Sequence, residues 1–207
     1  MVAIVDYGVG NLFSLRSSLR VIGQECVVSG DAEALRGADS VILPGVGAFG
    51  DAAAKLRARG LDAVIKRLAA EGKPLLGICL GMQLLFDVSF EYGRHEGLGL
   101  IKGQVVPMSG RLPQGLKIPH IGWNPLIFKR PDCPLFRYIS QGDCVYFVHS
   151  FFADGCAESV CAEAEYGLPI PAVVGGGNVF GCQFHPEKSG KTGLDILRAF
   201  CQIGVGR

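Results

Sequence analysis

Short apolar runs alternate with segments of helical periodicity along the first ninety residues. The apolar runs predict strands over residues 2–6, 25–28, 40–43 and 74–78. Helices are expected from a cap at Asn11 to residue 22, over residues 31–36, and over residues 52–70 with an interruption near Gly60. Strands that are bounded by glycine turns and linked by helices pair in parallel through right-handed crossovers.

The second half of the chain has a different pattern. Strands separated by turns are predicted over residues 98–101, 104–106, 118–128, 143–153, 159–164, 172–174 and 179–184. Short connections favour direct hairpins and antiparallel pairing there. A last helix is predicted over residues 190–203. The expected fold is therefore a single α/β domain over residues 1–207, with a mixed, mostly parallel open sheet flanked by helices.

Charge and cysteine usage exclude several classes of function. The 20 Lys and Arg residues against 19 Asp and Glu residues give a net charge of +1, which argues against nucleic acid or an anionic membrane as the main partner. The first residues lack the basic region of a secretory signal, and no apolar stretch is long enough to span a membrane. Eight scattered cysteines therefore indicate reduced, mostly buried thiols in a cytoplasmic protein.

A cysteine at a strand-to-helix turn is the strongest chemical signal. The run Gly77-Ile78-Cys79-Leu80-Gly81 follows an apolar strand, as in a nucleophile elbow with Cys in place of Ser. A thiol at a helix N-terminus is favoured as thiolate, and the backbone N–H of Leu80 would point toward a developing oxyanion. The alternative interpretation is a buried cysteine between glycines that serve helix packing.

A cysteine nucleophile needs a base and a group that orients the base. His185 and Glu187 end the last apolar strand, and Pro186 between them stops strand pairing. If the chain stays extended, the two side chains project to the same side, with one ring nitrogen of His185 left for Cys79. Taken alone, this segment also fits a surface turn. His95, beside Glu91 and Glu96, is expected on a solvated surface loop.

A glycine-rich loop precedes the second helical region. Gly45, Gly47 and Gly50 formally match the dinucleotide fingerprint, but Glu71, at the matching distance, lies at a helix end. We favour the interpretation that this loop donates a second backbone N–H to an oxyanion. Metal ligands are not expected, because the spacing from Cys182 to His185 has no second pair of ligands.

Together these motifs resemble the class I, triad-type glutamine amidotransferases. The resemblance rests on residues 77–83 and on His185-Pro186-Glu187. Five further segments narrow the resemblance to the glutaminase subunits of imidazole glycerol phosphate synthases. They are residues 6–11, 44–50, 120–124, 148–150 and 183–189. The matching blocks run in the family's order through nearly the whole chain. The resemblance implies a flavodoxin-like sheet and no cofactor.

The resemblance also implies a role for individual residues. Cys79 would attack the side-chain amide of glutamine, with His185 and Glu187 relaying protons. The residues implied for the oxyanion site and the glutamine pocket are Gly45, Val46, Gly47, Leu80, Gln83, His149, Ser150 and Phe151. Phe151 departs from the family, whose members often have Tyr there. Asn11, Trp123 and Lys188 match positions that contact a (β/α)8 cyclase subunit, to which ammonia passes.

Two other functions remain compatible with the residues alone. One is a cysteine peptidase or esterase built on a similar elbow. The other is a non-catalytic redox-sensing thiol protein, which would need Cys79 but not the pair of His185 and Glu187.

Overall fold

The core of the fold is an eight-stranded mixed sheet. The computed structural model describes residues 1–203. Its strands lie in the order β2 (Cys26–Ser29), β1 (Val2–Val5), β3 (Ser40–Leu43), β4 (Leu75–Ile78), β14 (Val179–Cys182), β13 (Pro169–Gly176), β12 (Val160–Glu165) and β9 (Ile127–Phe128). Neighbours from β2 to β14 pair in parallel, and those from β14 to β9 pair antiparallel. The mixed, mostly parallel sheet is confirmed; residues 204–207 of the predicted domain lie outside the described residues.

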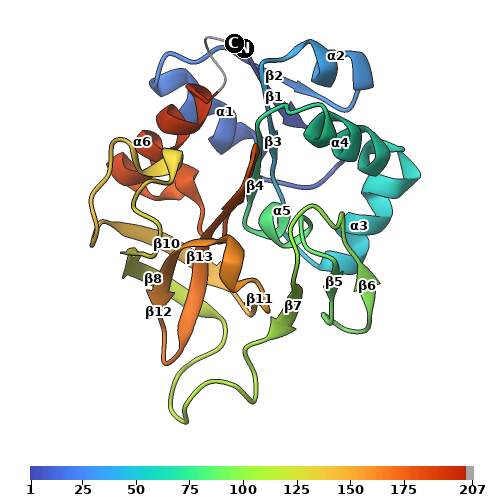
Figure 1. Cartoon of the computed structure of the whole chain (residues 1–207). Helices are drawn as coiled ribbons and strands as arrows, with labels where there is room; N and C mark the ends of the chain where they lie inside the picture. The colour runs from blue at the N-terminus through green and yellow to red at the C-terminus, as the bar shows by residue number, and fades with distance from the viewer. Residues whose placement is uncertain (204–207) are drawn as a thin grey trace.

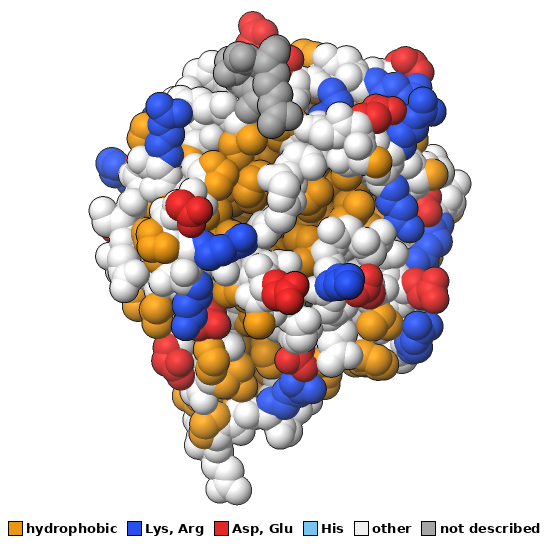
Figure 2. All heavy atoms as spheres, viewed as in Figure 1, with side chains coloured by type: hydrophobic (Ala, Val, Ile, Leu, Met, Phe, Trp, Pro, Cys, Tyr) orange, Lys and Arg blue, Asp and Glu red, His pale blue; other side chains and the backbone are white. Residues whose placement is uncertain are grey.

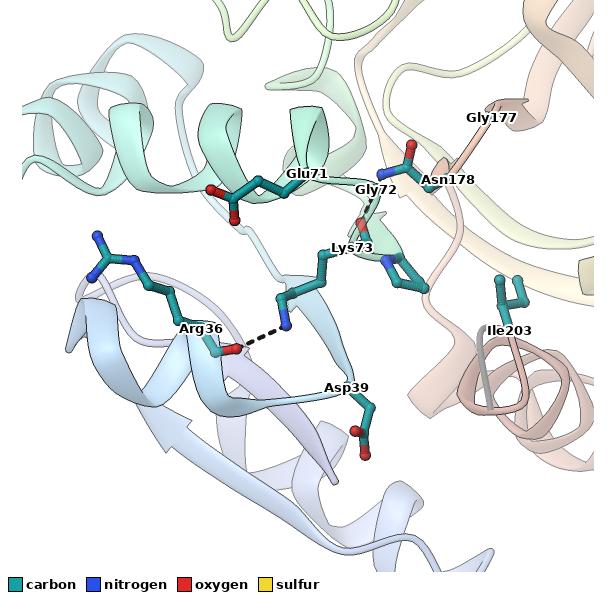
Figure 3. A pocket seen from close by; sticks show the side chains of 9 residues that line it. Arg36, Asp39, Glu71, Gly72, Lys73, Gly177, Asn178 and Ile203 are labelled. Atoms are coloured by element: carbon teal, nitrogen blue, oxygen red, sulfur yellow. Dashed lines mark hydrogen bonds between the residues drawn. The ribbon is translucent and has the colours of Figure 1, made fainter. Parts of the chain in front are cut away.

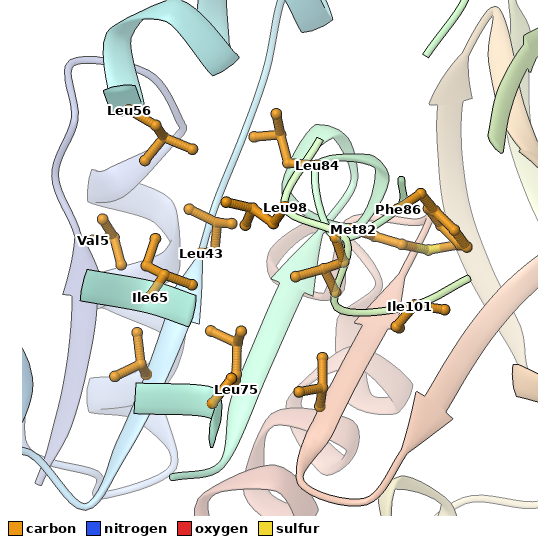
Figure 4. Close-up of a cluster of buried hydrophobic side chains, with 14 of the residues drawn as sticks. Val5, Leu43, Leu56, Ile65, Leu75, Met82, Leu84, Phe86, Leu98 and Ile101 are labelled. Atoms are coloured by element: carbon orange, nitrogen blue, oxygen red, sulfur yellow. The ribbon is translucent and has the colours of Figure 1, made fainter. Parts of the chain in front are cut away.

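Helices cover both faces of the parallel strands (Figure 1). On one face lie α1 (Leu12–Val21) and α6 (Gly190–Cys201); on the other lie α2 (Ala32–Gly37), α3 (Phe49–Ala58) and α4 (Leu61–Ala70). Alternate residues of β1 serve the two cores, Val2 and Ile4 on the α1 side and Ala3 and Val5 on the α4 side. A strand buried on both faces is apolar at every position, which explains the unbroken apolar runs. Figure 4 shows the α4-side core around Leu43 and Ile65.

Two small sheets complete the second half of the chain. One consists of β10 (Cys144–His149) and β8 (His120–Pro125); the other orders β11 (Phe151–Asp154), β7 (Gln104–Pro107), β5 (Val88–Ser89) and β6 (His95–Glu96). The single strands predicted over 118–128 and 143–153 are therefore wrong. Each is two strands, broken at Leu126 and at Ser150, whose parts join different sheets. The break at Ser150 places a turn beside the carboxyl ends of the parallel strands.

The strand predicted over residues 98–101 is also wrong. These residues form an irregular loop, whose N–H groups donate to the carbonyls of Leu84, Leu85 and Phe86, and Leu98 and Ile101 are buried. Because those carbonyls are used in this way, the helix after Cys79 is only the single turn α5 (Leu80–Gln83).

The remaining elements are short 3-10 helices: η1 (Pro134–Phe136), η2 (Ala157–Ser159) and η3 (Pro186–Lys188). Within residues 1–203, no helix has the length and apolar character needed to cross a bilayer.

Candidate active site

Cys79 occupies a strained turn between β4 and α5. Its backbone has φ 54° and ψ −111°, and its N–H donates to the carbonyl of Cys182 on β14 (2.8 Å). A non-glycine residue at positive φ costs free energy and is retained where the surroundings require it. The flanking glycines are required sterically: a Cβ on Gly77 would lie 2.6 Å from the carbonyl oxygen of Gly81, and one on Gly81 would lie 1.9 Å from that of Leu43. The predicted elbow is therefore present.

His185 and Glu187 meet beside Cys79. The Nδ1 atom of His185 lies 2.8 Å from Oε1 of Glu187, and both side chains are buried. The pairing was predicted, but for the wrong reason, because the chain turns into η3 at Pro186 instead of staying extended. Ser189 fixes this turn, since its hydroxyl donates to the carbonyl of His185 (2.7 Å) and accepts from the N–H of Tyr146 (3.0 Å).

The environment of His185 favours its charged form. Burial lowers the pKa of His185, but hydrogen bonds and charge interactions with Cys79 and Glu187 together raise it to about 9. A histidine with this pKa is protonated at neutral pH. Because α5 is only four residues long, this imidazolium, more than a helix dipole, supplies the positive charge at Cys79.

A cleft of about 300 Å³ opens above Cys79. Most of the predicted substrate residues line it: Val46, Gly47, Leu80, Gln83, His149, Ser150 and Phe151. His185 and Lys188 also line it. Cys79 is 8% exposed and lines this cleft, so its thiol is not sealed within the core.

The loop after β3 lies against the elbow. A Cβ on Gly45 would lie 2.7 Å from the N atom of Gly81, so the loop approaches the elbow too closely for a side chain. Gly47 has φ +90°. Among the described residues, the N–H groups of Leu80 and Val46 donate to no protein acceptor. Gly45 itself lies outside the cleft, in a small pocket that also contacts Asn11 and Glu187.

Buried polar side chains hold the wall of the cleft opposite the elbow. The carbonyl of Phe151 accepts from Nε2 of Gln83 (3.0 Å) and from Nδ1 of His149 (2.9 Å). Burial lowers the pKa of His149 to about 3, so this ring is neutral. His120 supports it from behind, with its Nδ1 3.0 Å from Nε2 of His149. The wall is therefore fixed by side-chain to backbone bonds.

Sequence reasoning missed two residues of the cleft. Glu91 is buried, and its carboxylate accepts from the N–H of Phe49 (2.6 Å), whereas a solvated loop was predicted. Burial raises the pKa of Glu91. Tyr92 has φ 52° and its ring packs edge-on against Phe151 (5.9 Å between centroids). No local signal marked either one, because the turn that brings them to Cys79 is set by β5 and β6.

Two of the residues implied for a partner contact, Lys188 and Trp123, are linked through Tyr146. Trp123 on β8 is 54% exposed, and its ring contacts that of Tyr146 at 5.8 Å. The Nζ atom of Lys188 lies 5.9 Å from the centre of the Tyr146 ring. A row of side chains thus leads from the cleft to an exposed aromatic residue.

Another cavity, of about 620 Å³ among the described residues, lies at the opposite end of the sheet (Figure 3). It adjoins residues that precede β3, β4 and β14, namely Asp39, Lys73 and Asn178. Ligand sites of open α/β sheets lie instead at the carboxyl ends of the strands, where Cys79 and His185 are. The Lys73 ammonium is already bonded to the carbonyls of Arg36 and Ala38.

Figure 2 shows acidic and basic side chains interspersed over the face in view.

Comparison with known proteins places the chain in a family. The family model of glutamine amidotransferase class-I matches residues 3–203. Imidazole glycerol phosphate synthase subunit HisH of Caldanaerobacter subterraneus subsp. tengcongensis is 51% identical, over 98% of this chain and 98% of its own length. The subunit of the same name from Geobacillus kaustophilus is 51% identical, over 100% of this chain and 99% of its own length.

Solved structures share the fold. A crystal structure of a glutamine amidotransferase matches with a TM-score of 0.77 and 21% identity, over 99% of this chain and 100% of the other. The structure of PurLQS from Thermotoga maritima matches with a TM-score of 0.76 and 23% identity, over 98% and 97%. The chain belongs to the class I glutamine amidotransferases, in the group of imidazole glycerol phosphate synthase HisH subunits.

Proposed function

We propose that this chain hydrolyses glutamine through Cys79, His185 and Glu187. The observation that carries the proposal is that His185 lies between the elbow thiol and a buried carboxylate at the floor of a cleft. The sulfur of Cys79 attacks the side-chain amide carbon, and His185 gives a proton to the leaving nitrogen, so that ammonia departs from a γ-glutamyl thioester. Water then attacks the thioester, His185 takes its proton, and glutamate is released.

The oxyanion of each tetrahedral intermediate would be held by backbone N–H groups. Leu80 directly follows the nucleophile, and the loop over Gly45, Val46 and Gly47 lies against the elbow. Their N–H groups donate to no protein acceptor among the described residues, so they are available to a developing charge.

The cleft has the size and polarity that free glutamine needs. Glu91 offers a carboxylate to the α-ammonium of the substrate, and the wall formed by His149, Ser150 and Phe151 faces the elbow. Gln83 holds this wall through the carbonyl of Phe151. Because Phe151 lacks the hydroxyl of a tyrosine, it contributes packing and its backbone to the pocket and no side-chain hydrogen bond.

We further propose a cyclase subunit with a (β/α)8 barrel as the partner. Ammonia is mostly protonated in neutral water and is then unreactive, so a synthase gains from a closed route to the acceptor. Asn11, Trp123 and Lys188 would contact this partner, in line with the exposed Trp123. Eight free cysteines fit the reducing cytoplasm as the compartment.

Replacement of the nucleophile tests the proposed function. Cys79→Ala should lower glutamate release from glutamine by at least about a thousandfold, measured with the cyclase subunit present, because the thioester cannot form. Cys144→Ala is the matched control, since that thiol is exposed and outside the cleft. Unchanged turnover in Cys79→Ala, with the circular dichroism of the parent chain, would contradict the proposal.

The two rival functions give different results in two further assays. A peptidase or esterase would cleave a panel of fluorogenic peptides and esters and leave glutamine intact. A thiol sensor without catalysis would keep its reactivity toward alkylating agents in His185→Ala. The proposed function requires the loss of both glutaminase activity and fast alkylation in that variant.

A further inference from the structure

A second thiol site lies outside the cleft, where β12 meets the segment that follows β9. The guanidinium of Arg130 donates through Nη2 to the carbonyls of Gly175 (2.6 Å) and Ser159 (3.0 Å) and to Sγ of Cys161 (2.7 Å). Among the described residues, Arg130 makes no ion pair with a carboxylate. The Cys161 sulfur is therefore the group nearest to this cation that can carry a negative charge.

A second cysteine faces the first. The interaction between the thiols of Cys133 and Cys161 is the largest influence on the pKa of each. Together with Arg130, and against the effects of burial and of Asp132, it lowers the pKa of Cys161. The same interaction and burial raise the pKa of Cys133. Cys161 is therefore the thiol of the pair that ionises more readily, and Cys133 is the one that keeps its proton.

The backbone already holds the two cysteines together. The N–H groups of Lys129 and Arg130 both donate to the carbonyl of Cys161 (2.8 and 3.0 Å). The N–H of Cys133 donates to the carbonyl of Arg130 (3.1 Å), which closes a turn over residues 130–133. The turn that carries Cys133 is therefore bonded through Arg130 to the backbone of Cys161, and a disulfide requires two backbones that are held near each other.

The site opens to solvent through a pocket of its own. A cavity of about 150 Å³ is lined by Arg130, both cysteines and the glycine run Gly175–Gly177. Cys133 is 7% exposed and Cys161 1% exposed, so a molecule of the size of water reaches the sulfurs more readily than a bulky reagent does. Hydrogen peroxide has that size.

We propose that Cys133 and Cys161 form a reversible disulfide when the protein meets hydrogen peroxide. The Cys161 thiolate attacks one peroxide oxygen, the O–O bond breaks, and the released hydroxide takes a proton to give water, leaving a sulfenic acid. The Cys133 sulfur then attacks the Cys161 sulfur, the S–O bond breaks, and a second water leaves. The two thiols lose two electrons and two protons, and peroxide is reduced to two waters.

The bond would brace the part of the chain that carries the cleft wall. The segment between the two cysteines includes β10 and His149–Phe151. A disulfide across this segment restricts the unfolded chain more than the folded one. The oxidised protein should therefore have a higher midpoint of thermal unfolding than the reduced protein.

Peptide mapping tests the proposal directly. The full chain is treated with hydrogen peroxide at pH 7, alkylated, and digested with trypsin and a Glu-specific protease. Digestion leaves Cys133 in a peptide of residues 130–137 and Cys161 in a peptide of residues 159–163, and neither peptide contains another cysteine. The expected product is these two peptides linked, lighter by two hydrogen atoms than their sum. A dithiol reductant should restore both thiols.

Variants separate this site from the catalytic one. The link should persist in Cys79→Ala, so that failure of the proposed glutaminase function would leave this result unaffected. Cys156→Ser is the matched control, because burial raises the pKa of that thiol to about 11 and no other thiol is paired with it. In Cys133→Ser the Cys161 sulfenic acid should accumulate and react with a dicarbonyl probe.

The role of Arg130 has its own readout. Arg130→Gln should slow formation of the link at pH 7, because the Cys161 thiolate loses one of the two groups that stabilise it while Cys133 remains. In the parent chain the rate should fall as the pH is lowered and the Cys161 thiolate takes up a proton, which checks the same point without a variant. Recovery of both cysteines as alkylated thiols, at peroxide doses that oxidise Cys79, would overturn the proposal.

Discussion

The charge on His185 is the residue-scale feature with the widest consequences. Buried imidazoles are usually neutral, as His149 is in the same cleft. His185 differs because the Glu187 carboxylate and the Cys79 sulfur both lie against its ring and stabilise the proton. Two histidines in one cleft thus carry different charges: His185 is the proposed proton donor, and His149 donates to the carbonyl of Phe151.

This charge makes stability depend on pH. The folded pKa of about 9 lies above the ordinary value of 6.5, so the proton on His185 stabilises the fold fully below pH 6.5 and not at all above pH 9. The difference in the free energy of unfolding between the parent chain and His185→Gln should therefore shrink by up to about 3 kcal/mol between about pH 6 and pH 10. Urea unfolding at both pH values measures it.

His149→Gln serves as the comparison for this experiment. Because burial keeps the folded pKa of His149 near 3, the folded state holds no extra proton on this residue over the same pH range, whereas the unfolded chain takes one up near the ordinary pKa of 6.5. The loss of stability on its replacement should therefore be slightly larger at pH 10 than at pH 6, by less than about 1 kcal/mol, which is the opposite trend to that of His185. The same trend in both variants would show that His185 carries no extra proton in the folded state.

Single residues of the site differ in how far their sequence context revealed them. Cys79, His185 and Glu187 could be predicted because glycines, a proline and strand ends mark them locally. Glu91 could not, because its burial depends on the N–H of Phe49 in a distant helix. A polar residue in a loop is predicted to be exposed to solvent unless the segment that buries it is known.

At the scale of elements, the elbow depends on close contact between three backbones. Gly81 lies so near β3 that a Cβ would overlap the carbonyl of Leu43, and a Cβ on Gly77 would lie 2.6 Å from the carbonyl oxygen of Gly81 in α5. Parallel strands β3, β4 and β14 are thereby held at the spacing that brings the loop after β3, Cys79 and His185 to one edge.

Gly81→Ala should therefore disrupt the elbow. The added Cβ would lie 1.9 Å from a backbone oxygen, which cannot move as a side chain does, so a loss of at least about 3 kcal/mol in the free energy of unfolding is expected. Gly37→Ala is the control, because Gly37 ends α2 with open space around it, and alanine there should be neutral or stabilising by up to about 1 kcal/mol. Equal stability of the two variants, measured by urea unfolding, would contradict this account of the elbow.

The type of each secondary-structure element was easier to predict than the strands with which it pairs. The parallel half follows from local patterns, because each strand is apolar on both faces and each helix has one apolar stripe. The second half does not, because the breaks at Leu126 and Ser150 depend on which sheet each piece joins. A polar residue inside an apolar run, such as Ser150, was the only local signal of such a break.

At the scale of the whole molecule, the proposed partner face and the oxyanion loop are physically joined. Asn11 caps α1, and the neighbouring Gly10 packs so closely on Pro44 that a Cβ would lie 3.0 Å from its ring. Pro44 is also held by the Tyr7 hydroxyl, which donates to its carbonyl (2.7 Å). Packed atoms therefore connect Asn11 with the segment that contains Gly45 and Val46.

This connection leads to a prediction about activation. If the cyclase subunit contacts Asn11 and Trp123, its binding shifts the loop that supplies the oxyanion N–H, and Gly47 at φ +90° permits a peptide there to reorient. Addition of the cyclase subunit with its ligand should then raise kcat for glutamine far more than it lowers KM, because an interaction made only in the transition state has been added. Steady-state kinetics with and without the partner measure both constants.

Trp123→Ala distinguishes binding from activation in that experiment. An exposed tryptophan at an interface centre contributes about 2–4 kcal/mol to association. In Trp123→Ala, the concentration of cyclase subunit needed for half activation should therefore rise about thirtyfold or more, and the activity at saturation should be retained. Val21→Ala, an exposed apolar residue at the far end of α1 from Asn11, should leave that concentration unchanged. Equal kcat with and without the partner would mean that the loop is already competent in the isolated subunit, and the partner would then serve only to receive ammonia.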